Sequence, residues 1–175
     1  MDRLDVSTVI YAPHREVYEF VTDFPRYARY SRYLDRVRQL GDGGAGTRYE
    51  LHFAWWKLNY TARSEVIDVV PPDRVDWELV RDITAEGAWT VEPTPEEAPA
   101  DVSTATRARL QVDFDPNSAR GGAIDIPRFV SFDWVLRKAK PVVVEEAKRV
   151  VGGMVADIEG EPRPVELTVH ASPTV

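Results

Sequence analysis

The first part of the chain shows a strand pattern of hydrophobic residues followed by a helix pattern. The segment DVSTVIYA, residues 5–12, is rich in β-branched residues and ends at Pro13, which predicts a strand followed by a helix start. From His14 to Phe24 apolar residues recur every three or four positions, as on one face of a helix. Pro25 suits the first turn of a second short helix. The chain therefore begins with one strand and two short helices.

Between residues 34 and 114 the hydrophobic pattern changes to a period of two, which is typical of strands with one buried face. The glycine-rich turn GDGGAG, residues 41–46, separates the first two strands, and proline-containing turns at 69–74 and 92–101 separate later ones. The pattern predicts a meander of about six antiparallel strands. Large residues on its buried face are Tyr49, Leu51, Phe53, Trp55, Trp77 and Leu110.

The helical period returns at Ile126 and continues on one broad apolar face for about thirty residues. Pro141 lies inside this stretch and lacks the backbone N–H that a helix interior needs. We therefore expect a bend near Lys140 and a straight helix from about Val142 to Glu159. Apolar positions on the predicted helix face include Phe129, Leu136 and Val143.

The length and apolar content fit a single domain. A chain of 175 residues with 43% hydrophobic residues can bury a substantial core, and we assign residues 1–160 to it. Residues 161–175 are short and punctuated by proline, which predicts a loose, disordered C-terminal extension. The alternative is that VELTVHA, residues 165–171, pairs as a strand.

Composition argues against several classes of function. The chain has 29 acidic and 22 basic residues, a net charge of −7, so it repels phosphate polymers and we expect no nucleic-acid partner. The absence of cysteine excludes disulfides, thiolate metal sites and thiol nucleophiles. The three histidines lack metal-ligand spacing, and GxSxG, GxxxxGK[ST] and GxGxxG motifs are absent. We expect no metal and no cofactor, and assign no catalytic residue.

No apolar stretch has the length of about 18 residues that a membrane span requires, and the N-terminal residues lack an apolar signal core. We therefore expect a cytoplasmic protein without stable membrane insertion. The pattern gives no prediction of oligomeric state.

Three segments resemble the START-like superfamily, in particular its polyketide cyclase and coenzyme-Q-binding-protein-like members. They are VIYAPHREVYEFVTDFPRY (9–27), GDGGAGTRYEL (41–51) and EVIDVVPPDRVDWEL (65–79), and a long terminal helix follows them. The resemblance covers roughly residues 4–160. It implies an α+β helix-grip fold, in which a curved antiparallel sheet of about seven strands surrounds a long C-terminal helix, with two short helices after the first strand.

The resemblance also implies an apolar cavity between sheet and helix, and three functions remain open. The first is binding of an apolar or amphipathic small molecule (a lipid, isoprenoid or polyketide) as carrier, sensor or chaperone. The second is a polyketide cyclase or dehydratase that uses the same cavity, which converging polar residues would favour. The third is a protein- or ribosome-interaction module, which a filled core would favour; its contact residues would be Arg29, Arg32 and Arg36.

The segment RYARYSRYLDR, residues 26–36, repeats arginine followed by tyrosine. On a helix the tyrosines would face inward and the arginines outward, so we interpret the segment as a lid beside the cavity. Elsewhere, we predict that Trp56 is a rim or interface residue and that Asp133 faces water. The predicted ligand-binding residues are Tyr30, Tyr33, Tyr49, Leu51, Phe53, Trp55, Trp77, Leu110, Phe129 and Leu136.

Overall fold

The computed structural model describes residues 1–119 and 126–173, except for the side chains of Phe132 and Leu136. Within them, eight antiparallel strands form one sheet in the order β2-β3-β4-β5-β6-β7-β1-β8. The strands are β1 (Asp2–Ile10), β2 (Leu34–Leu40), β3 (Arg48–Trp55), β4 (Leu58–Val70), β5 (Arg74–Leu79), β6 (Thr84–Pro93), β7 (Thr106–Asp115) and β8 (Thr168–Ala171).

Two short helices follow β1, as the pattern predicts, but they differ in type. The first, α1 (His14–Val21), is an α-helix, whereas the second, η1 (Phe24–Arg29), is a 3-10 helix. Two single-turn 3-10 segments, η2 (Pro95–Glu97) and η3 (Pro116–Ala119), flank β7.

The long helix α2 (Phe132–Glu159) begins six residues later than the apolar pattern at Ile126 suggests. The start is set by Ser131, whose hydroxyl accepts a hydrogen bond from the Trp134 N–H and so satisfies one of the free donors of the first turn. The helix continues through Pro141 and ends at Gly160, whose φ of 88° favours glycine.

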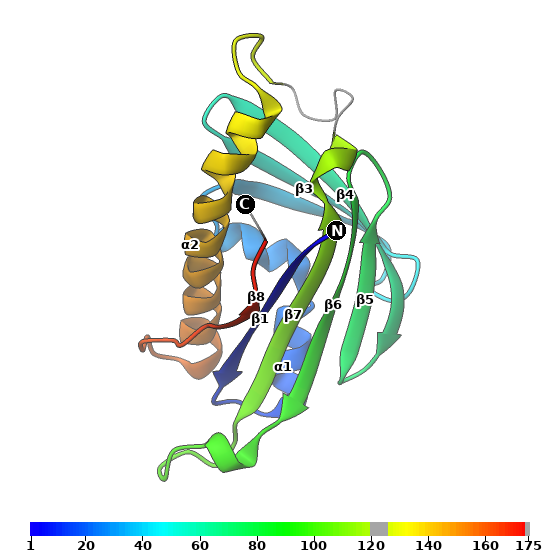
Figure 1. Cartoon of the computed structure of the whole chain (residues 1–175). Coiled ribbons are helices and arrows are strands. Elements are labelled where there is room, and N and C mark those ends of the chain that lie inside the picture. The colour runs from blue at the N-terminus through cyan, green and yellow to red at the C-terminus, as the bar shows by residue number, and fades with distance from the viewer. Residues whose placement is uncertain (120–125, 174–175) are drawn as a thin grey trace.

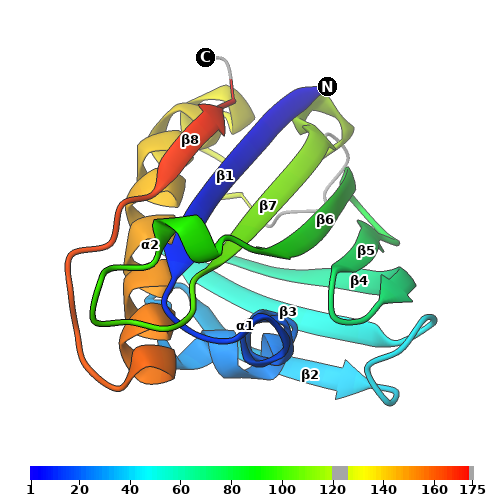
Figure 2. The same ribbon diagram turned by 90° about the horizontal axis from the view of Figure 1, so that it is seen from below.

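The sheet curves strongly around one side of α2, and α1 and η1 lie at one end of the space between them (Figures 1 and 2). Helix α1 contacts β6, β7 and α2, so it fills that end. This is the α+β helix-grip arrangement implied by the resemblance. The sheet has eight strands rather than about seven because part of the C-terminal stretch joins it.

That eighth strand corresponds to the alternative given above for VELTVHA. Strand β8 pairs with β1 on the edge opposite β7, so this part of the 161–175 extension is ordered rather than loose. The chain leading to it is held by Arg163, which bonds the Glu159 carboxylate and the carbonyl oxygen of Val9. The Thr8 hydroxyl donates to the carbonyl oxygen of Glu166.

Candidate functional site

A cavity of about 470 Å³ lies between the concave face of the sheet and the N-terminal half of α2. Strands β3 to β7 supply most of its wall, and Ala139, Lys140, Val143 and Val144 of α2 close it from the other side. The volume lies within the range of about 300 to 1,000 Å³ that is usual for small-molecule sites.

The strand register explains why the floor of the cavity is apolar and aromatic. Because side chains alternate between faces, directly paired residues of β3 and β4 point to the same side. These pairs are Phe53 with Tyr60, Leu51 with Ala62, and Tyr49 with Ser64, and all six residues line the cavity.

A glycine makes room for the largest ring of the wall. Gly87 on β6 pairs with Trp77 on β5, and a Cβ atom at Gly87 would lie only 2.3 Å from Cζ2 of the Trp77 indole. The missing side chain therefore lets the indole lie across β6, where it forms part of the cavity wall.

Three of the hydroxyl groups on residues that line this apolar cavity have no described hydrogen-bond partner. Tyr49 and Ser64 lie opposite each other on β3 and β4, and neither hydroxyl has a hydrogen-bond partner within residues 1–119 and 126–173. The Tyr60 hydroxyl is buried and also lacks a partner there. Burial raises the pKa of Tyr49 and Tyr60 above the ordinary value, so both remain protonated donors at neutral pH.

The sequence profile described as polyketide cyclase / dehydrase and lipid transport matches residues 1–159. The chain belongs to this family. No curated protein matches it in sequence.

Solved structures similar to this family member support the fold. The Zhui aromatase/cyclase from Streptomyces sp. R1128 superposes with a TM-score of 0.64 at 16% identity, over 90% of this chain and 93% of that one. TTHA0849 from Thermus thermophilus gives a TM-score of 0.62 at 18% identity, over 90% and 97%. The di-domain ARO/CYC BexL from the BE-7585A biosynthetic pathway gives 0.56 at 14% identity, over 93% of this chain and 51% of that chain.

Half of the predicted ligand-binding residues meet in the cavity. The five that line it are Tyr49, Leu51, Phe53, Trp77 and Leu110. Tyr30, Tyr33, Trp55 and Phe129 are not among the described lining residues, and the Leu136 side chain lies outside the described part of the chain. Whether any of them binds a ligand stays a prediction.

Tyr30 packs on α2 instead of on the cavity. Its hydroxyl donates to the Asp157 carboxylate, and its ring lies over Gly153, where a Cβ would be 2.6 Å from Cδ1. Ser31 Oγ and the Arg32 N–H both bond Glu146 Oε1 at 2.6 Å. The segment after α1 is thus fastened to α2.

Of the predicted lid segment, residues 26–36, Tyr27 lines the cavity, and so does Phe24, which precedes that segment in η1. Whether the segment acts as a lid stays a prediction. The Tyr27 hydroxyl donates to the carbonyl oxygen of Val21, and burial raises its pKa well above the ordinary value. Arg29 and Arg32 are exposed, as the helical pattern suggested.

Strand periodicity could have identified several lining residues that the sequence prediction omitted. Positions 60, 62, 64 and 66 of β4 share one face, as do positions 112 and 114 with the predicted Leu110 on β7, and all of them line the cavity. Phe24, Tyr27 and Lys140 carried no comparable signal, because their place at the wall depends on how η1 and α2 pack.

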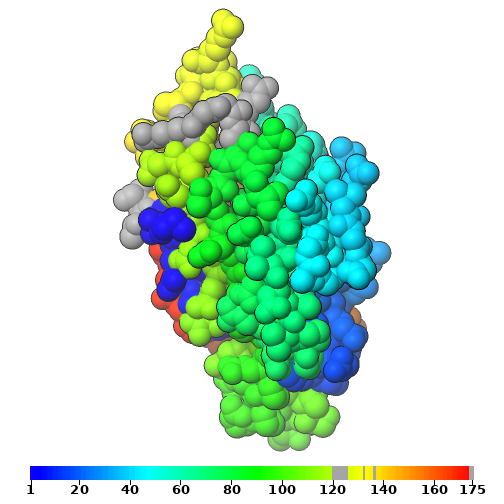
Figure 3. All heavy atoms as spheres, turned by 90° about the vertical axis from the view of Figure 1, so that its right-hand side faces the viewer, coloured from blue at the N-terminus to red at the C-terminus, as the bar shows by residue number. Residues whose placement is uncertain are grey.

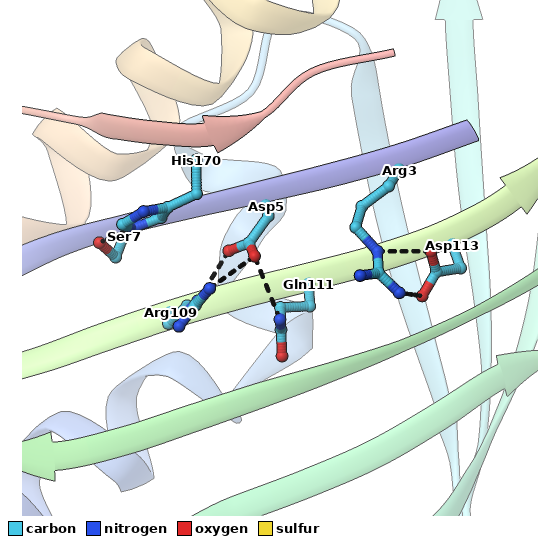
Figure 4. Close-up of polar contacts among 7 residues, drawn as sticks. All are labelled: Arg3, Asp5, Ser7, Arg109, Gln111, Asp113 and His170. Carbon is cyan, nitrogen blue, oxygen red and sulfur yellow. Dashed lines mark hydrogen bonds and ion pairs between the residues drawn. The ribbon is translucent and has the colours of Figure 1, made fainter.

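A second polar cluster lies on the outer face of β1 and β7 (Figure 4). Arg109 makes two hydrogen bonds to Asp5, and Gln111 adds a third at 3.1 Å. The guanidinium of Arg109 therefore lowers the pKa of Asp5. Ser7 Oγ lies 2.8 Å from Nε2 of His170 on β8.

This cluster resembles a serine-histidine-aspartate set only in composition. A triad requires the carboxylate to orient the imidazole, whereas the side-chain hydrogen bonds of Asp5 go to Arg109 and Gln111. Ser7 is also buried. The cluster joins β8 to the sheet and does not face the cavity. Among the described residues, no group of three or more histidine and acidic side chains could hold a metal ion.

Two further predictions concern residues near the β3–β4 turn and the start of α2. Trp56 is exposed in the turn, and Asp133 is exposed in the first turn of α2. In the described part of the chain no helix is long and apolar enough to cross a membrane.

Proposed function

We propose that this protein binds an apolar or amphipathic small molecule in the cavity, as a carrier, sensor or chaperone. The cavity itself is the observation that carries the proposal: a space of about 470 Å³ is walled by aromatic and aliphatic side chains. An apolar ligand that enters it removes apolar surface from water, which stabilises the complex by roughly 25 cal/mol per Å² of buried surface.

The wall favours a ligand with flat or conjugated parts and a small polar group. Trp77, Trp89, Phe53 and Tyr60 offer ring faces, against which planar groups stack well. The hydroxyls of Tyr49 and Ser64, on two residues that both line the cavity, are each able to bond a carbonyl or hydroxyl group of the ligand. Polyketides, isoprenoids and lipids all fit this description. Family membership and the aromatase/cyclase names of two similar structures favour a polyketide-like compound.

An enzyme of the cyclase or dehydratase type is the second candidate. Its support is the presence of Tyr49, Ser64 and Lys140 among the lining residues, because a hydroxyl or an ammonium group could polarise a carbonyl. The described lining residues include no aspartate, glutamate or histidine, which are the usual general acids and bases. Binding without catalysis is therefore the preferred function. The interaction module required a filled core, and the cavity argues against it.

Native mass spectrometry of freshly purified protein tests the proposal directly, since a bound ligand adds mass that organic extraction removes. The matched variants are Ala62→Phe, which places a ring on the cavity floor, and Thr61→Phe, which places the same ring on the outer face of β4. Only Ala62→Phe should lose the co-purifying compound and the binding of an apolar fluorescent dye.

A folded Ala62→Phe protein that binds dye as well as Thr61→Phe would contradict the proposal. Thermal melts establish that both variants are folded. Conversion of the identified ligand or its precursor by the wild-type protein, lost on Ser64→Ala, would assign the enzyme function instead.

A further inference from the structure

Two exposed aromatic side chains meet one lysine at the end of the molecule that includes the β3–β4 turn. Trp56 and Phe129 are 52% and 77% exposed, and Lys57 Nζ lies 5.7 Å from the centre of each ring. The Trp134 ring lies 5.5 Å from that of Trp56, and Lys138 Nζ lies 6.0 Å from the Trp134 ring. We call these five residues the aromatic–lysine tip.

The tip adjoins the cavity wall. Phe53 and Tyr60, on the strands that the tip turn connects, line the cavity, and Ala139 and Lys140 directly follow Lys138 on α2. In Figure 1 the turn between β3 and β4 lies beside the first turns of α2, and in Figure 3 the yellow residues from this region project beyond the rest of the molecule.

The backbone of the β3–β4 turn is unfavourable for a tryptophan at position 56. Its φ of 53° is in the left-handed region, where glycine, asparagine or aspartate is normal and a bulky residue is an outlier. A tryptophan that is both exposed and in an unfavourable conformation points to a function outside the core, which the proposal below supplies.

Charge at the tip is opposite to that of the whole chain. Residues 55–58 and 126–140 contain five basic residues and one acidic residue, whereas the chain has a net charge of −7. Three of the four lysines of the sequence, at 57, 138 and 140, lie in these two segments. A basic and aromatic surface on an acidic protein complements a negatively charged partner.

We propose that the aromatic–lysine tip docks on the surface of an anionic lipid membrane. Tryptophan rings settle at the level of the lipid headgroups, and lysines beside them pair with anionic phosphates. Docking on a membrane places the cavity next to a source or destination of apolar molecules. This role of the docking rests on the proposed ligand-binding function. Such docking is peripheral, because it inserts side chains and no helix.

A second copy of the chain fits the tip less well than a membrane does. A symmetric contact would bring Lys57 and Lys138 of both copies together, and like charges oppose such a contact. A phospholipid surface supplies many negative charges and an apolar layer at the depth of the rings, so it satisfies both parts of the tip.

Flotation with lipid vesicles tests the docking. Wild-type protein should float with vesicles of phosphatidylglycerol mixed with phosphatidylcholine, and far less with phosphatidylcholine alone. Binding should weaken as salt is raised toward about 1 M, where the Debye length is only about 3 Å. Lys57→Glu with Lys138→Glu should weaken it by about tenfold or more. Trp56→Asn with Phe129→Ser should weaken it by about tenfold.

Two matched controls separate the tip from general surface effects. Lys148→Glu reverses an exposed lysine elsewhere on α2, and Ile67→Ser removes an exposed apolar residue from β4. Both should bind vesicles like the wild type. Asparagine is chosen at position 56 because it tolerates a positive φ. Dye binding by every variant is measured in parallel, so that loss of the cavity and loss of docking are distinguished.

Three results would overturn the proposal. The first is wild-type protein that binds dye but does not float with anionic vesicles. The second is flotation that the control variants reduce as much as the tip variants do. The third is that the tip variants leave vesicle binding unchanged but abolish self-association or binding to an acidic polypeptide such as polyglutamate. Loss of self-association would assign the tip to a second copy of the chain, and loss of polyglutamate binding would assign it to an acidic protein.

Discussion

The two halves of α2 lie against the same sheet but have different surroundings. The C-terminal half places Val151, Met154 and Val155 against β1, β6 and β7, where the remaining space is about 20 Å³. The N-terminal half places Val143 and Val144 beside a space of about 470 Å³. One half of the helix thus packs as a core, and the other covers a cavity.

Helix α1 supplies a layer at the packed end that the cavity end does not have among the described residues. Val17 and Val21 of α1 are almost fully buried in the same hydrophobic cluster as Met154 and Val155. Between the N-terminal half of α2 and the concave sheet face, the described residues supply no such layer. Stability and binding capacity are therefore separated along one helix, and substitutions can test that separation.

The largest expected effect is in the packed half. Met154 is 4% exposed, and Met154→Ala should lower the free energy of unfolding by about 2 to 5 kcal/mol. Val143→Ala on the same helix is the matched change, because Val143 lines the cavity and is 48% exposed. It should cost less than about 1 kcal/mol. Urea unfolding measures both.

Equal losses at the two positions would show that the N-terminal half of α2 is also packed, and the comparison would fail. Dye binding provides the reverse test, since only Val143→Ala changes the cavity wall.

Alanine substitutions at two adjacent glycines of α2 should give the next largest changes in stability, with opposite signs. A Cβ at Gly153 would lie 2.6 Å from the Tyr30 ring, whereas one at Gly152 would meet nothing within 4 Å. Gly153→Ala should displace Tyr30 and destabilise the fold by about 1 to 3 kcal/mol. Gly152→Ala should stabilise it by about 1 kcal/mol through helix propensity. Thermal melts decide, and two changes of the same sign would contradict this packing.

The sequence predicted the fold better than it predicted the site. Period-two alternation marked the strands and thus five of the cavity residues, because the face of a strand follows from its pattern alone. The family resemblance supplied the curvature and the cavity. To predict that Tyr30 packs on α2, one must know which side of η1 faces α2. A short 3-10 helix has no long hydrophobic repeat from which that side can be read.

The start of α2 shows another limit of the pattern. Apolar residues continue back to Ile126, but Ser131 caps the helix and its first residue is Phe132. Phe129, predicted on the helix face, consequently lies before the helix and is exposed. Trp56 is exposed, in agreement with the argument that two adjacent tryptophans cannot both point inward on a regular strand, and its role as a rim or interface residue stays a prediction.

Removing a tyrosine hydroxyl should change the free energy of unfolding by a smaller amount, and with opposite signs at the cavity and near α1. Tyr60→Phe removes a buried hydroxyl that lacks a described partner, so it should raise the free energy of unfolding by about 1 kcal/mol. Tyr27→Phe removes the donor to the Val21 carbonyl and should lower it by about 1 kcal/mol. If the ligand forms a hydrogen bond with Tyr60, Tyr60→Phe should be more stable without ligand but should retain less ligand in native mass spectra.

The smallest expected effect is a pH dependence at the packed half of α2. Burial, followed by the bond to Asp157, raises the pKa of Tyr30 to about 12, above the ordinary value of about 10. The neutral phenol is thus favoured in the folded state. Its contribution to stability is complete below about pH 10, where the unfolded tyrosine is also protonated, and is lost as pH rises through about 12.

Tyr30→Phe should therefore make the loss of stability between about pH 10 and 12 shallower, without abolishing it, because burial also raises the pKa of Tyr27 and Tyr49. Asp157→Asn keeps the shape of the partner but removes its charge, so it should produce a smaller change in the same direction. Urea unfolding across this pH range measures the slope. An unchanged slope in Tyr30→Phe would mean that the tyrosine ring is not held against α2. The segment after α1 would then rely on the bonds of Ser31 and Arg32 to Glu146 for its attachment to α2.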